Sequence, residues 1–402
     1  MDGTMQLAVH VRESGSGVAA AAAALVPEVF ATLAAAEAPW RELERGPGVL
    51  MTPYQRFDWV AAYAATVGLE GGRLCLALLR DDAGRPRVLL PLVVRREAGI
   101  RVARVVGGRH ANYHMPVFAG PEAAALPAET LRRALARLGR SAGIDLFLLV
   151  HQPRRWDGAP NPLAALGSAS PSDAYGLALG PDPEAVLRRV LSGDARRKLR
   201  QKEKWLAAAH GPVAHRVAAD APETAAILEA YFAQKAARFA QLGIPDPFAD
   251  PAARAFVAAA CRPGRDGAPP ALELHALTLL ESGRVLATFA GAVDARRFSG
   301  MLTSFDPDPG LARFSPGDLL LQALVRDQAA RGRSALDLGV GEARYKSSVC
   351  DETIGLVDAH VPVTLRGALL ARATAGALRL KRRIKRDPRL WALVGRLRRR
   401  RP

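Results

Sequence analysis

The chain has 402 residues, 49% of them hydrophobic and 24% charged, a composition typical of a globular protein large enough for two domains. Three widely spaced cysteines, Cys75, Cys261 and Cys350, argue against a disulfide framework and favour the cytoplasm. No stretch approaches the ~20 uninterrupted apolar residues of a membrane-spanning helix. The net charge is +17, but residues 361–402 hold 14 Lys/Arg against one acid, Asp387, so the rest of the chain is only mildly basic.

Short patterned runs in the first 150 residues predict an α/β arrangement. Residues 40–67 contain a helix with Phe57 and Trp59 on its apolar side, and a hairpin follows, because two apolar runs flank a short polar turn. The elements expected after that helix are strands at 73–80, 87–94 and 100–106, a helix at 128–139 and a strand at 144–150.

The second half repeats this order of elements. Strands are expected at 272–280, 284–293 and 298–304, a helix at 315–331 and a strand at 334–338, preceded by helices at 183–210 and 222–241. An order-preserving repeat of this kind indicates a duplicated α/β unit. A Pro/Gly/Ser-rich stretch, 152–172, separates the copies. We therefore expect halves over 1–160 and 176–362, a linker over 161–175 and a basic tail over 363–402.

Two motifs of the first half resemble a serine-hydrolase motif and a zinc-binding motif, but their sequence context does not support either function. Residues 139–143 match G-x-S-x-G, but a nucleophile elbow needs a strand before the serine and a helix after it, and here that order is reversed. His110 and His114 have zinc-ligand spacing, yet they lie in a predicted loop without the glutamate of a zincin, so no metal site is expected. Asn112 and His114 could line a pocket between the halves, or be polar loop residues with local partners.

The turn before the predicted helix at 315–331 is the best candidate for a ligand site. Ser315 suits the N-cap and Pro316 the first helical position, where its missing N–H costs nothing. Gly317 leaves the backbone uncovered, and helix N-termini bind phosphates through free N–H groups and the positive end of the dipole. Arg313 adds a cation. Alternatively, this is an ordinary capped helix, and a first-turn Asp318 would repel a nearby anion.

Taken in order, the motifs of the second half resemble the CelD-like (BcsL-like) acetyltransferases of the GNAT superfamily. The matching pieces are residues 302–304, the Ser-Pro-Gly helix start and the pattern D-L-G-x-G-x-x-x-Y-K over 337–346, with weaker matches across 40–360. The resemblance implies an α/β (α+β) fold of two tandem GNAT-like halves with mixed, mostly antiparallel sheets. It also implies acyl-CoA as co-substrate, acetyl-CoA foremost, bound by Arg313, Phe314, Ser315, Pro316 and Gly317.

The implied activity is N-acyl transfer to a small-molecule or glycan amine, with envelope or exopolysaccharide synthesis as the family context. Such chemistry needs a neutral amine, a positioned thioester and an acid for the leaving thiolate. The candidate bases are Asp337, Glu342 and Asp306. Tyr345 could protonate the thiolate and Lys346 could hold a phosphate or carboxylate, although this pair could instead lie at a strand edge with a solvated lysine.

A basic helix within 194–210 offers an alternative function. Arg196 and Arg200 share one face at i, i+4 spacing, which is usually a solvated face but could bind an anionic substrate. Fem-type aminoacyl transferases, which are also tandem GNAT-like folds, bind aminoacyl-tRNA. The mildly basic body of the chain argues against strong nucleic-acid binding.

The C-terminal tail is predicted to be an amphipathic helix. Leu365, Leu369, Ala373, Ala377, Leu380 and Ile384 fall on one helical face, with arginines and lysines elsewhere. Asp387 and Pro388 begin a second short helix with Trp391. An apolar face framed by Lys/Arg is typical of a helix at an anionic membrane surface. Alternatives are a disordered tail, a helix packed on the body, or a non-catalytic adaptor that keeps the GNAT fold.

Overall fold

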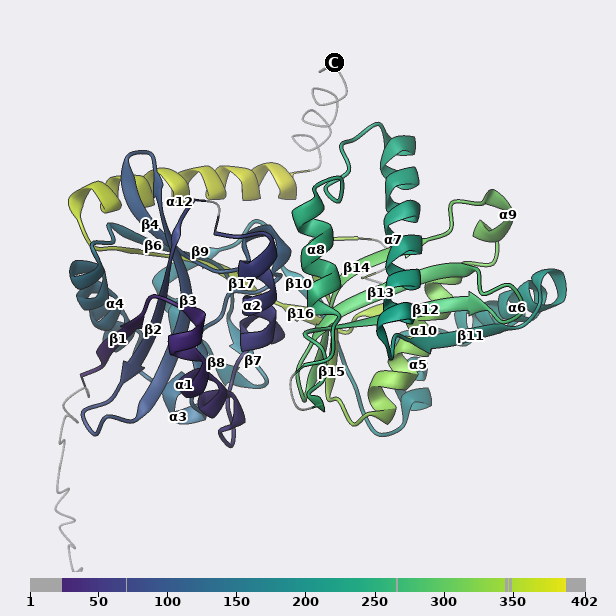
Figure 1. The fold of residues 1–402 in the computed structure, drawn as a ribbon, viewed down its shortest axis with the longest axis horizontal. Coiled ribbons are helices and arrows are strands. Elements are labelled where there is room, and N and C mark those ends of the chain that lie inside the picture. Colours follow the sequence, from purple (N-terminus) through teal and green to yellow (C-terminus); the bar gives the residue numbers. More distant parts are fainter. Residues whose placement is uncertain (1–23, 70, 265–266, 344–345, 347–348, 388–402) are drawn as a thin grey trace, which may run out of the picture.

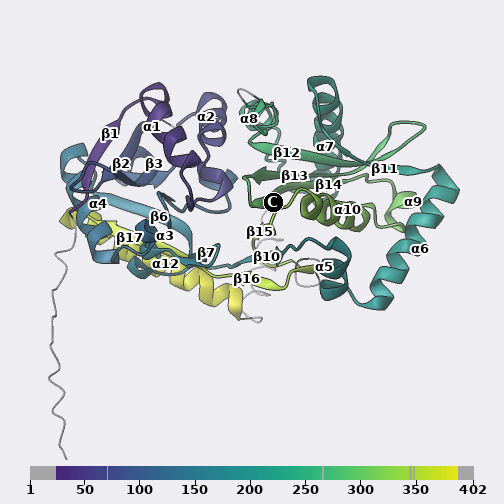
Figure 2. The ribbon, with the colours of Figure 1, turned by 90° about the horizontal axis from the view of Figure 1, so that it is seen from below.

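The computed structural model describes residues 24–387 except 70, 265–266, 344–345 and 347–348. Two mixed β-sheets lie side by side in one elongated molecule, and helices cover both faces of each sheet (Figures 1 and 2). Of the helices in the described part of the chain, none has both the length and the hydropathy that crossing a bilayer would require.

The first sheet runs in the order β1-β2-β3-β4-β6-β17-β9, with β5 paired to β3. All its pairs are antiparallel except β4 with β6. Its strands are β1 (Val26–Phe30), β2 (Arg73–Arg80), β3 (Pro86–Glu97), β4 (Ile100–Val105), β5 (Val117–Phe118), β6 (Leu146–Pro153), β9 (Gly167–Ala169) and β17 (Leu356–Pro362).

The second sheet runs in the order β11-β12-β13-β14-β15-β10-β16, and only β14 and β15 are parallel. Its strands are β10 (Ala174–Ala178), β11 (Val213–Val217), β12 (Leu272–Leu279), β13 (Val285–Val293), β14 (Arg297–Phe305), β15 (Ala335–Val340) and β16 (Glu352–Ile354). A separate hairpin pairs β7 (Arg155–Trp156) with β8 (Ala159–Pro160). The first five strands of this order correspond to the first five of the first sheet, and the last two do not.

The predicted duplication is therefore confirmed. Each half has an antiparallel hairpin, a third strand, a helix and a strand parallel to the third, in that chain order. The strands read as continuous apolar runs because helices cover both faces of each sheet, so side chains of either parity are buried. The fold is the expected α/β arrangement of two mixed, mostly antiparallel sheets.

The helices form two layers on opposite sides of the sheets. Figure 2 shows α1, α2, α7 and α8 along one side and α12, α5 and α6 along the other. The helices are α1 (Leu33–Arg45), α2 (Phe57–Thr66), α3 (Pro121–Ala124), α4 (Ala128–Ala142), α5 (Pro183–Val190), α6 (Gly193–His210), α7 (Ala221–Leu242), α8 (Pro251–Ala260), α9 (Pro309–Ala312), α10 (Pro316–Ala330) and α12 (Leu365–Arg386), with 3-10 turns η1 (Pro53–Gln55), η2 (Gly108–His110) and η3 (Pro162–Leu166).

Sheet membership does not follow the boundaries expected at 161–175 and 362. After the second sheet is complete, the chain returns to the first sheet as β17, which pairs with β6 and β9. The segment expected to be a linker contributes β9 to that edge, and β10 lies between β15 and β16 in the second sheet. Proline, glycine and serine mark turns in a sequence, but they do not show which distant strand a short segment will pair with.

One hydrophobic cluster spans both halves, and within it α2 packs against α8. The guanidinium of Arg56, from the first half, donates to the backbone carbonyls of Pro269 (3.1 Å), Pro270 (2.9 Å) and Val293 (2.8 Å) of the second. Arg56 is only 7% exposed. These contacts fix the halves to one another and so fix the residues that meet at their junction.

Candidate functional site

The two parallel strands of the second sheet separate at its centre. β14 and β15 pair only through Arg297–Ser299 and Ala335–Asp337 and diverge beyond these residues. On its other side, β14 pairs with β13 through a bulge, in which Met301 is the extra residue between the pairs made by Gly300 and Leu302. Bulges are frequent beside active sites because they redirect the strand. The divergence leaves part of the β14 edge without a neighbouring strand.

Asn112 of the first half stands where the strands diverge. Its Nδ2 donates to the Gly300 carbonyl of β14 (2.9 Å) and to the Tyr54 hydroxyl (2.6 Å), and its Oδ1 accepts from the Val340 N–H (3.4 Å). Gly339 permits this approach, because a Cβ there would lie 2.5 Å from the Asn112 amide and its φ is +73°. Asn112 thus joins the halves at the opening between the two strands.

Asp337, expected as a base, is completely buried just below this opening. Its Oδ1 accepts hydrogen bonds from the Tyr113 hydroxyl (2.9 Å), the Ser299 hydroxyl (2.8 Å) and the Gly339 N–H (3.1 Å). Its Oδ2 lies 3.6 Å from Nη1 of Arg297. Burial raises the pKa of Asp337, and the Arg297 charge opposes that rise. The carboxyl group holds the junction together and lines none of the three cavities described below.

The other acid–base candidates occupy separate places. Lys346 donates to the carbonyls of Gly339 and Val340 (3.1 Å each), and burial lowers its pKa. Glu342 is exposed, and Tyr345 lies outside the described residues. Asp306 accepts from Arg284 Nε (2.8 Å) at the end of the β12–β13 hairpin. Among the described candidates, Lys346 lies near enough to Asp337 to be affected by its charge. Neither of these two, nor Glu342 or Asp306, lines the cavities described below.

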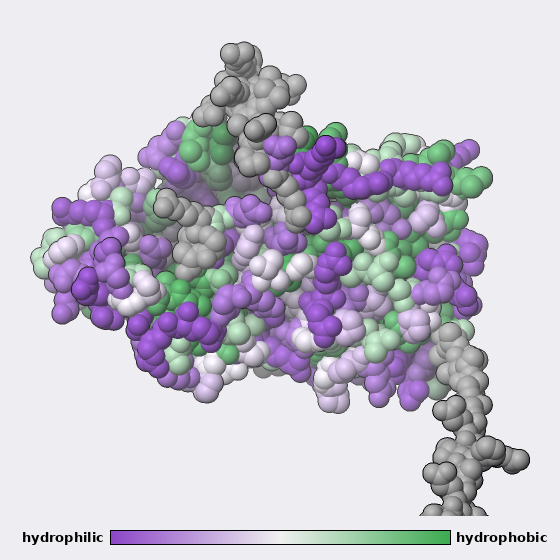
Figure 3. Space-filling view, turned by 180° about the vertical axis from the view of Figure 1, so that it is seen from behind, coloured by the Kyte–Doolittle hydropathy of each residue, from purple (hydrophilic) through white to green (hydrophobic). Residues whose placement is uncertain are grey.

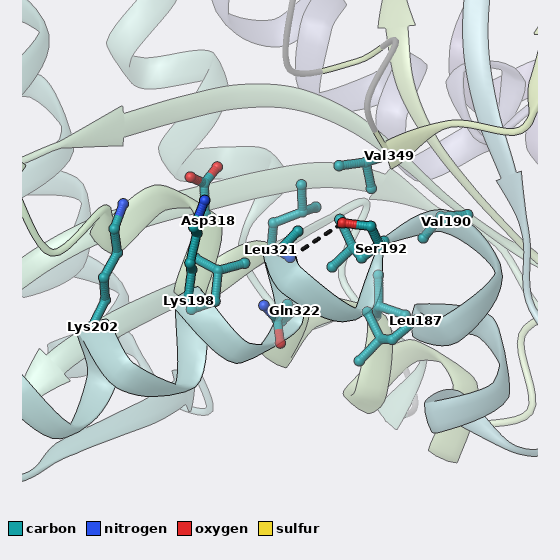
Figure 4. Close-up of a pocket in the computed structure, with 13 residues that line it drawn as sticks. Leu187, Val190, Ser192, Lys198, Lys202, Asp318, Leu321, Gln322 and Val349 are labelled. Carbon is teal, nitrogen blue, oxygen red and sulfur yellow. Dashed lines mark hydrogen bonds between the residues drawn. The ribbon is translucent and has the colours of Figure 1, made fainter.

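The first turn of α10 is flanked by two cavities that share Asp318 and Leu321. The first, of 300 Å³, is lined by Phe289, Thr303, Phe305, Ala312, Ser315, Pro316, Gly317, Asp318 and Leu321. The second, of 470 Å³, is lined by Leu187, Val190, Leu191, Ser192, Ala195, Lys198, Leu199, Lys202, Asp318, Leu321, Gln322, Val325 and Val349. We call these two cavities together the α10 groove. Lys198 and Lys202 extend from α6 at the Asp318 end, and Leu187, Val190 and Val349 lie at the other (Figure 4).

The helix start is unusually open. Ser315 has a left-handed backbone (φ +53°), and its Oγ accepts from Lys202 Nζ at 2.7 Å instead of capping the helix. A Cβ on Gly317 would meet nothing within 4 Å. Asp318 stands at the rim, where partial loss of water raises its pKa and Lys202 lowers it. A helix N-terminus with a lysine beside it offers both N–H groups and positive charge to an anion.

Of the five expected cofactor residues, three line the groove and two do not. Ser315, Pro316 and Gly317 form its wall. Phe314 is 3% exposed and belongs to the core of the second half, and the guanidinium of Arg313 lies over its ring at 4.6 Å.

A third cavity, of 210 Å³, lies at the junction of the halves. Its lining comes from the first half (Arg109, His110, Asn112), the loop after α7 (Pro247, Phe248) and the β14 bulge (Met301, Leu302). We call it the junction cavity. It places an imidazole and a guanidinium beside the bulge where β14 leaves β15.

The remaining substrate candidates lie elsewhere. His114 is 3% exposed, its Nδ1 is 3.2 Å from the Val150 carbonyl, and burial lowers its pKa to about 3. Arg200 is exposed and Arg196 half-buried on α6, and neither lines the α10 groove. Instead, Lys198 and Lys202 of the same helix do, and these two lysines lie one helical turn apart. Helical periodicity predicted a basic face on this helix. It could not predict which of the basic residues face α10, because that depends on how the two helices pack.

Sequence reasoning also missed His110, which it weighed only as a metal ligand with His114. The available signal was its place in the loop after β4, at the carboxyl end of a parallel strand, where α/β sheets commonly bind ligands.

Residues 193–347 match a family model described as an acetyltransferase (GNAT) domain. This range starts with α6, includes the hairpin, the bulged strand and the α10 groove, and ends beyond β15. The second half is therefore similar to acetyltransferase (GNAT) domains over these residues.

One solved structure resembles the fold of this chain with a TM-score above 0.5. FemX matches 87% of this chain and 99% of its own at 11% identity, with a TM-score of 0.57. L-PGS from Bacillus licheniformis matches 78% of this chain and 95% of its own, at 13% identity and a TM-score of 0.44. A tandem GNAT protein from the clavulanic acid biosynthesis pathway matches 85% of this chain and 99% of its own, at 11% identity and a TM-score of 0.38. No curated protein sequence matches the chain. The likeness to FemX concerns the fold alone.

Proposed function

We propose that the chain is an acyl-CoA-dependent N-acyltransferase that acts on an amine, with acetyl-CoA as the foremost donor. The observation that carries this proposal is the α10 groove. It combines an open helix start with a nearby lysine, it lies within the residues that match the GNAT domain model, and it borders β14 beyond the point where β14 separates from β15. Lys202 would exchange its bond to Ser315 for a phosphate oxygen, and the first turn of α10 would supply N–H donors.

The groove has further features that suit an acyl-pantetheine chain. Most of the larger cavity is apolar, from Leu187 to Val325, which matches alkyl segments. The Gln322 side chain is 9% exposed, and its Nε2 has no acceptor among the described residues. An amide or thioester carbonyl could accept from it, which would remove the cost of an unsatisfied buried donor.

The junction cavity is our candidate for the amine site. Acyl-CoA supplies an acyl group activated as a thioester. The amine nitrogen attacks that carbonyl carbon, the C–N bond forms, the C–S bond breaks and the thiolate leaves with the electron pair. His110 would take the proton that the amine gives up, and Asn112 would position the acceptor beside the β14 bulge. Asp337 acts on the reaction only by holding Ser299 and Tyr113 in place.

The acceptor class in this proposal is a small-molecule or glycan amine. It rests on the resemblance to CelD-like acetyltransferases, whose family context is envelope or exopolysaccharide synthesis. Arg109 at the rim of the junction cavity is compatible with an acceptor that carries a negative charge.

Thermal-shift titration with CoA and acetyl-CoA tests the cofactor assignment. We expect the melting temperature of the wild type to rise with ligand, since a ligand that binds only the native state stabilises it by RT ln(1 + [L]/Kd). Gly317→Trp should remove most of that rise, because the indole would enter the open space of the groove. The control is Gly376→Trp, which also places an indole where a Cβ meets nothing within 4 Å, but on α12.

A wild-type protein that shows no shift would overturn the assignment, as would equal shifts in wild type and Gly317→Trp. Failure to bind any CoA would favour the non-catalytic adaptor. Salt-sensitive tRNA binding that depends on Arg196 and Arg200 would favour the Fem-like aminoacyl-tRNA alternative, for which the exposed Arg200 is the structural support.

A further inference from the structure

The predicted apolar stripe of the tail is present on α12 and faces solvent. Leu365 is 87% exposed, Leu369 67% and Leu380 60%, and Ala373 and Ala377 between them are also exposed. Large exposed apolar side chains in a row along one helix face are uncommon, because burial of each would be favourable. On the face of the molecule that Figure 3 shows, hydrophobic residues occur in separate patches among hydrophilic ones.

The opposite face of α12 is already used, so the stripe is not a core face without a partner in this chain. α12 packs across β4, β6 and β17 of the first sheet, with Ala371 buried among Val102, Leu146 and Leu148. Gly367 brings the helix against the first sheet, since a Cβ there would lie 1.9 Å from the Asp145 carbonyl oxygen. The helix is therefore held in place while Leu365, Leu369 and Leu380 point outward.

The charged residues of α12 itself are all positive. Residues 365–386 contain eight Lys/Arg and no Asp/Glu. Arg372, Arg379 and Arg383 follow one another at i+7 and i+4 along one edge of the leucine stripe, and all three are exposed. A helix with leucines on its outer face and arginines along an edge of it matches the interface of a bilayer with anionic head groups.

We propose that α12 docks the protein on an anionic lipid surface. The helix would lie in the plane of the membrane, with its leucines among the acyl chains near the head groups and its arginines on lipid phosphates. A second copy of the chain is a poorer occupant, because a two-fold contact through this face would bring two sets of eight cations together. The proposal does not depend on the catalytic function.

Co-sedimentation of the full chain with vesicles tests this docking. Wild type should bind vesicles of phosphatidylglycerol and phosphatidylcholine, bind pure phosphatidylcholine far less, and dissociate as salt is raised. Leu369→Glu with Leu380→Glu should lower the partition coefficient at least tenfold. Neutralising Arg372, Arg379 and Arg383 to Gln should lower it by about fivefold for each charge.

The matched control is Leu242→Glu with Leu280→Glu, two leucines 50% exposed on the second half, which should bind as wild type does. Equal binding by wild type and the α12 leucine variant would overturn the proposal and place the contact in residues 388–402. Equal binding to charged and neutral vesicles would also overturn it. A third result would overturn it as well. In that case the wild type does not bind vesicles but forms a concentration-dependent dimer, detected by light scattering, and the leucine variant does not form this dimer.

Discussion

Single residues in the second half have roles that their types did not reveal. Asp337 and Lys346 both belong to the pattern that resembles the CelD-like family, yet both are buried and bonded at the junction of the halves. Asn112 completes that junction by bridging β14 and β15. The sequence does not show whether an aspartate or a lysine near the end of a strand faces a substrate or a neighbouring strand.

The charge of Asp318 gives a test at the same scale. A carboxylate at the first turn of α10 opposes a phosphate at that helix start, so Asp318→Asn should tighten CoA binding about two- to fivefold. Isothermal titration with CoA measures the change. Unchanged or weaker binding would show that the phosphates do not approach the start of α10, and Asp308→Asn on the preceding turn serves as the control.

Part of the site was predictable from the sequence and part was not. Ser315, Pro316 and Gly317 follow from capping rules, which depend only on neighbouring residues, and the structure places all three on the groove. Lys202 and His110 were missed, because their importance depends on which helix or strand they face. Such contacts arise from packing between segments more than 100 residues apart.

At the scale of elements, α1 and α2 are connected by a half-buried carboxyl group. Glu44 near the end of α1 accepts the N–H of Phe57, the first residue of α2, at 2.5 Å. Burial raises the pKa of Glu44 to about 7, against an ordinary value of 4.5. The fold therefore favours the protonated acid. Its contribution to stability is complete below pH 4.5 and is lost as the pH rises through 7.

Replacing Glu44 by Gln keeps an acceptor for Phe57 and removes the charge. We expect Glu44→Gln to be no more stable than wild type at pH 4.5 and more stable at pH 8, by about 1–2 kcal/mol. Urea unfolding at the two pH values measures the difference. The same difference at both pH values would refute the assigned titration, and Glu42→Gln, on an exposed position of the same helix, controls for surface charge.

Strands and helices were easier to predict than their partners. The hairpin β12–β13 and the helix α10 appear within a residue or two of the expected bounds, because apolar runs and a proline at the helix start mark them directly. The pairing of β17 with β6 could not be predicted in this way, since no local pattern identifies a strand partner some 200 residues away.

At the scale of the whole molecule, Arg56 is the clearest link between the halves. Arg56→Ala removes donors from three carbonyls of the second half and should lower the free energy of unfolding by about 3 kcal/mol. Urea unfolding followed by fluorescence and circular dichroism measures this. Arg73→Ala is the control, because exposed Arg73 donates to one carbonyl of its own half, and its effect should stay within about 0.5 kcal/mol. A small effect of Arg56→Ala would show that the shared core alone holds the halves together.

The duplication was predictable at this scale, because the same order of elements recurs along the chain. Sheet membership was not, because the end of the chain leaves the second half and completes the first.

Because β17 belongs to the first sheet, that sheet cannot be completed until the end of the chain has been synthesised. β6 leaves the ribosome with no neighbour on one side, and its partner is made about 200 residues later, which at about 5–20 residues per second means roughly 10–40 s. Throughout that interval the nascent first half exposes the unpaired edge of a buried strand, a template for pairing with another chain. We therefore expect folding of this chain to depend on chaperones that bind the nascent first half. A truncation before β17 would leave the first sheet incomplete, although most of its strands lie at the start of the chain.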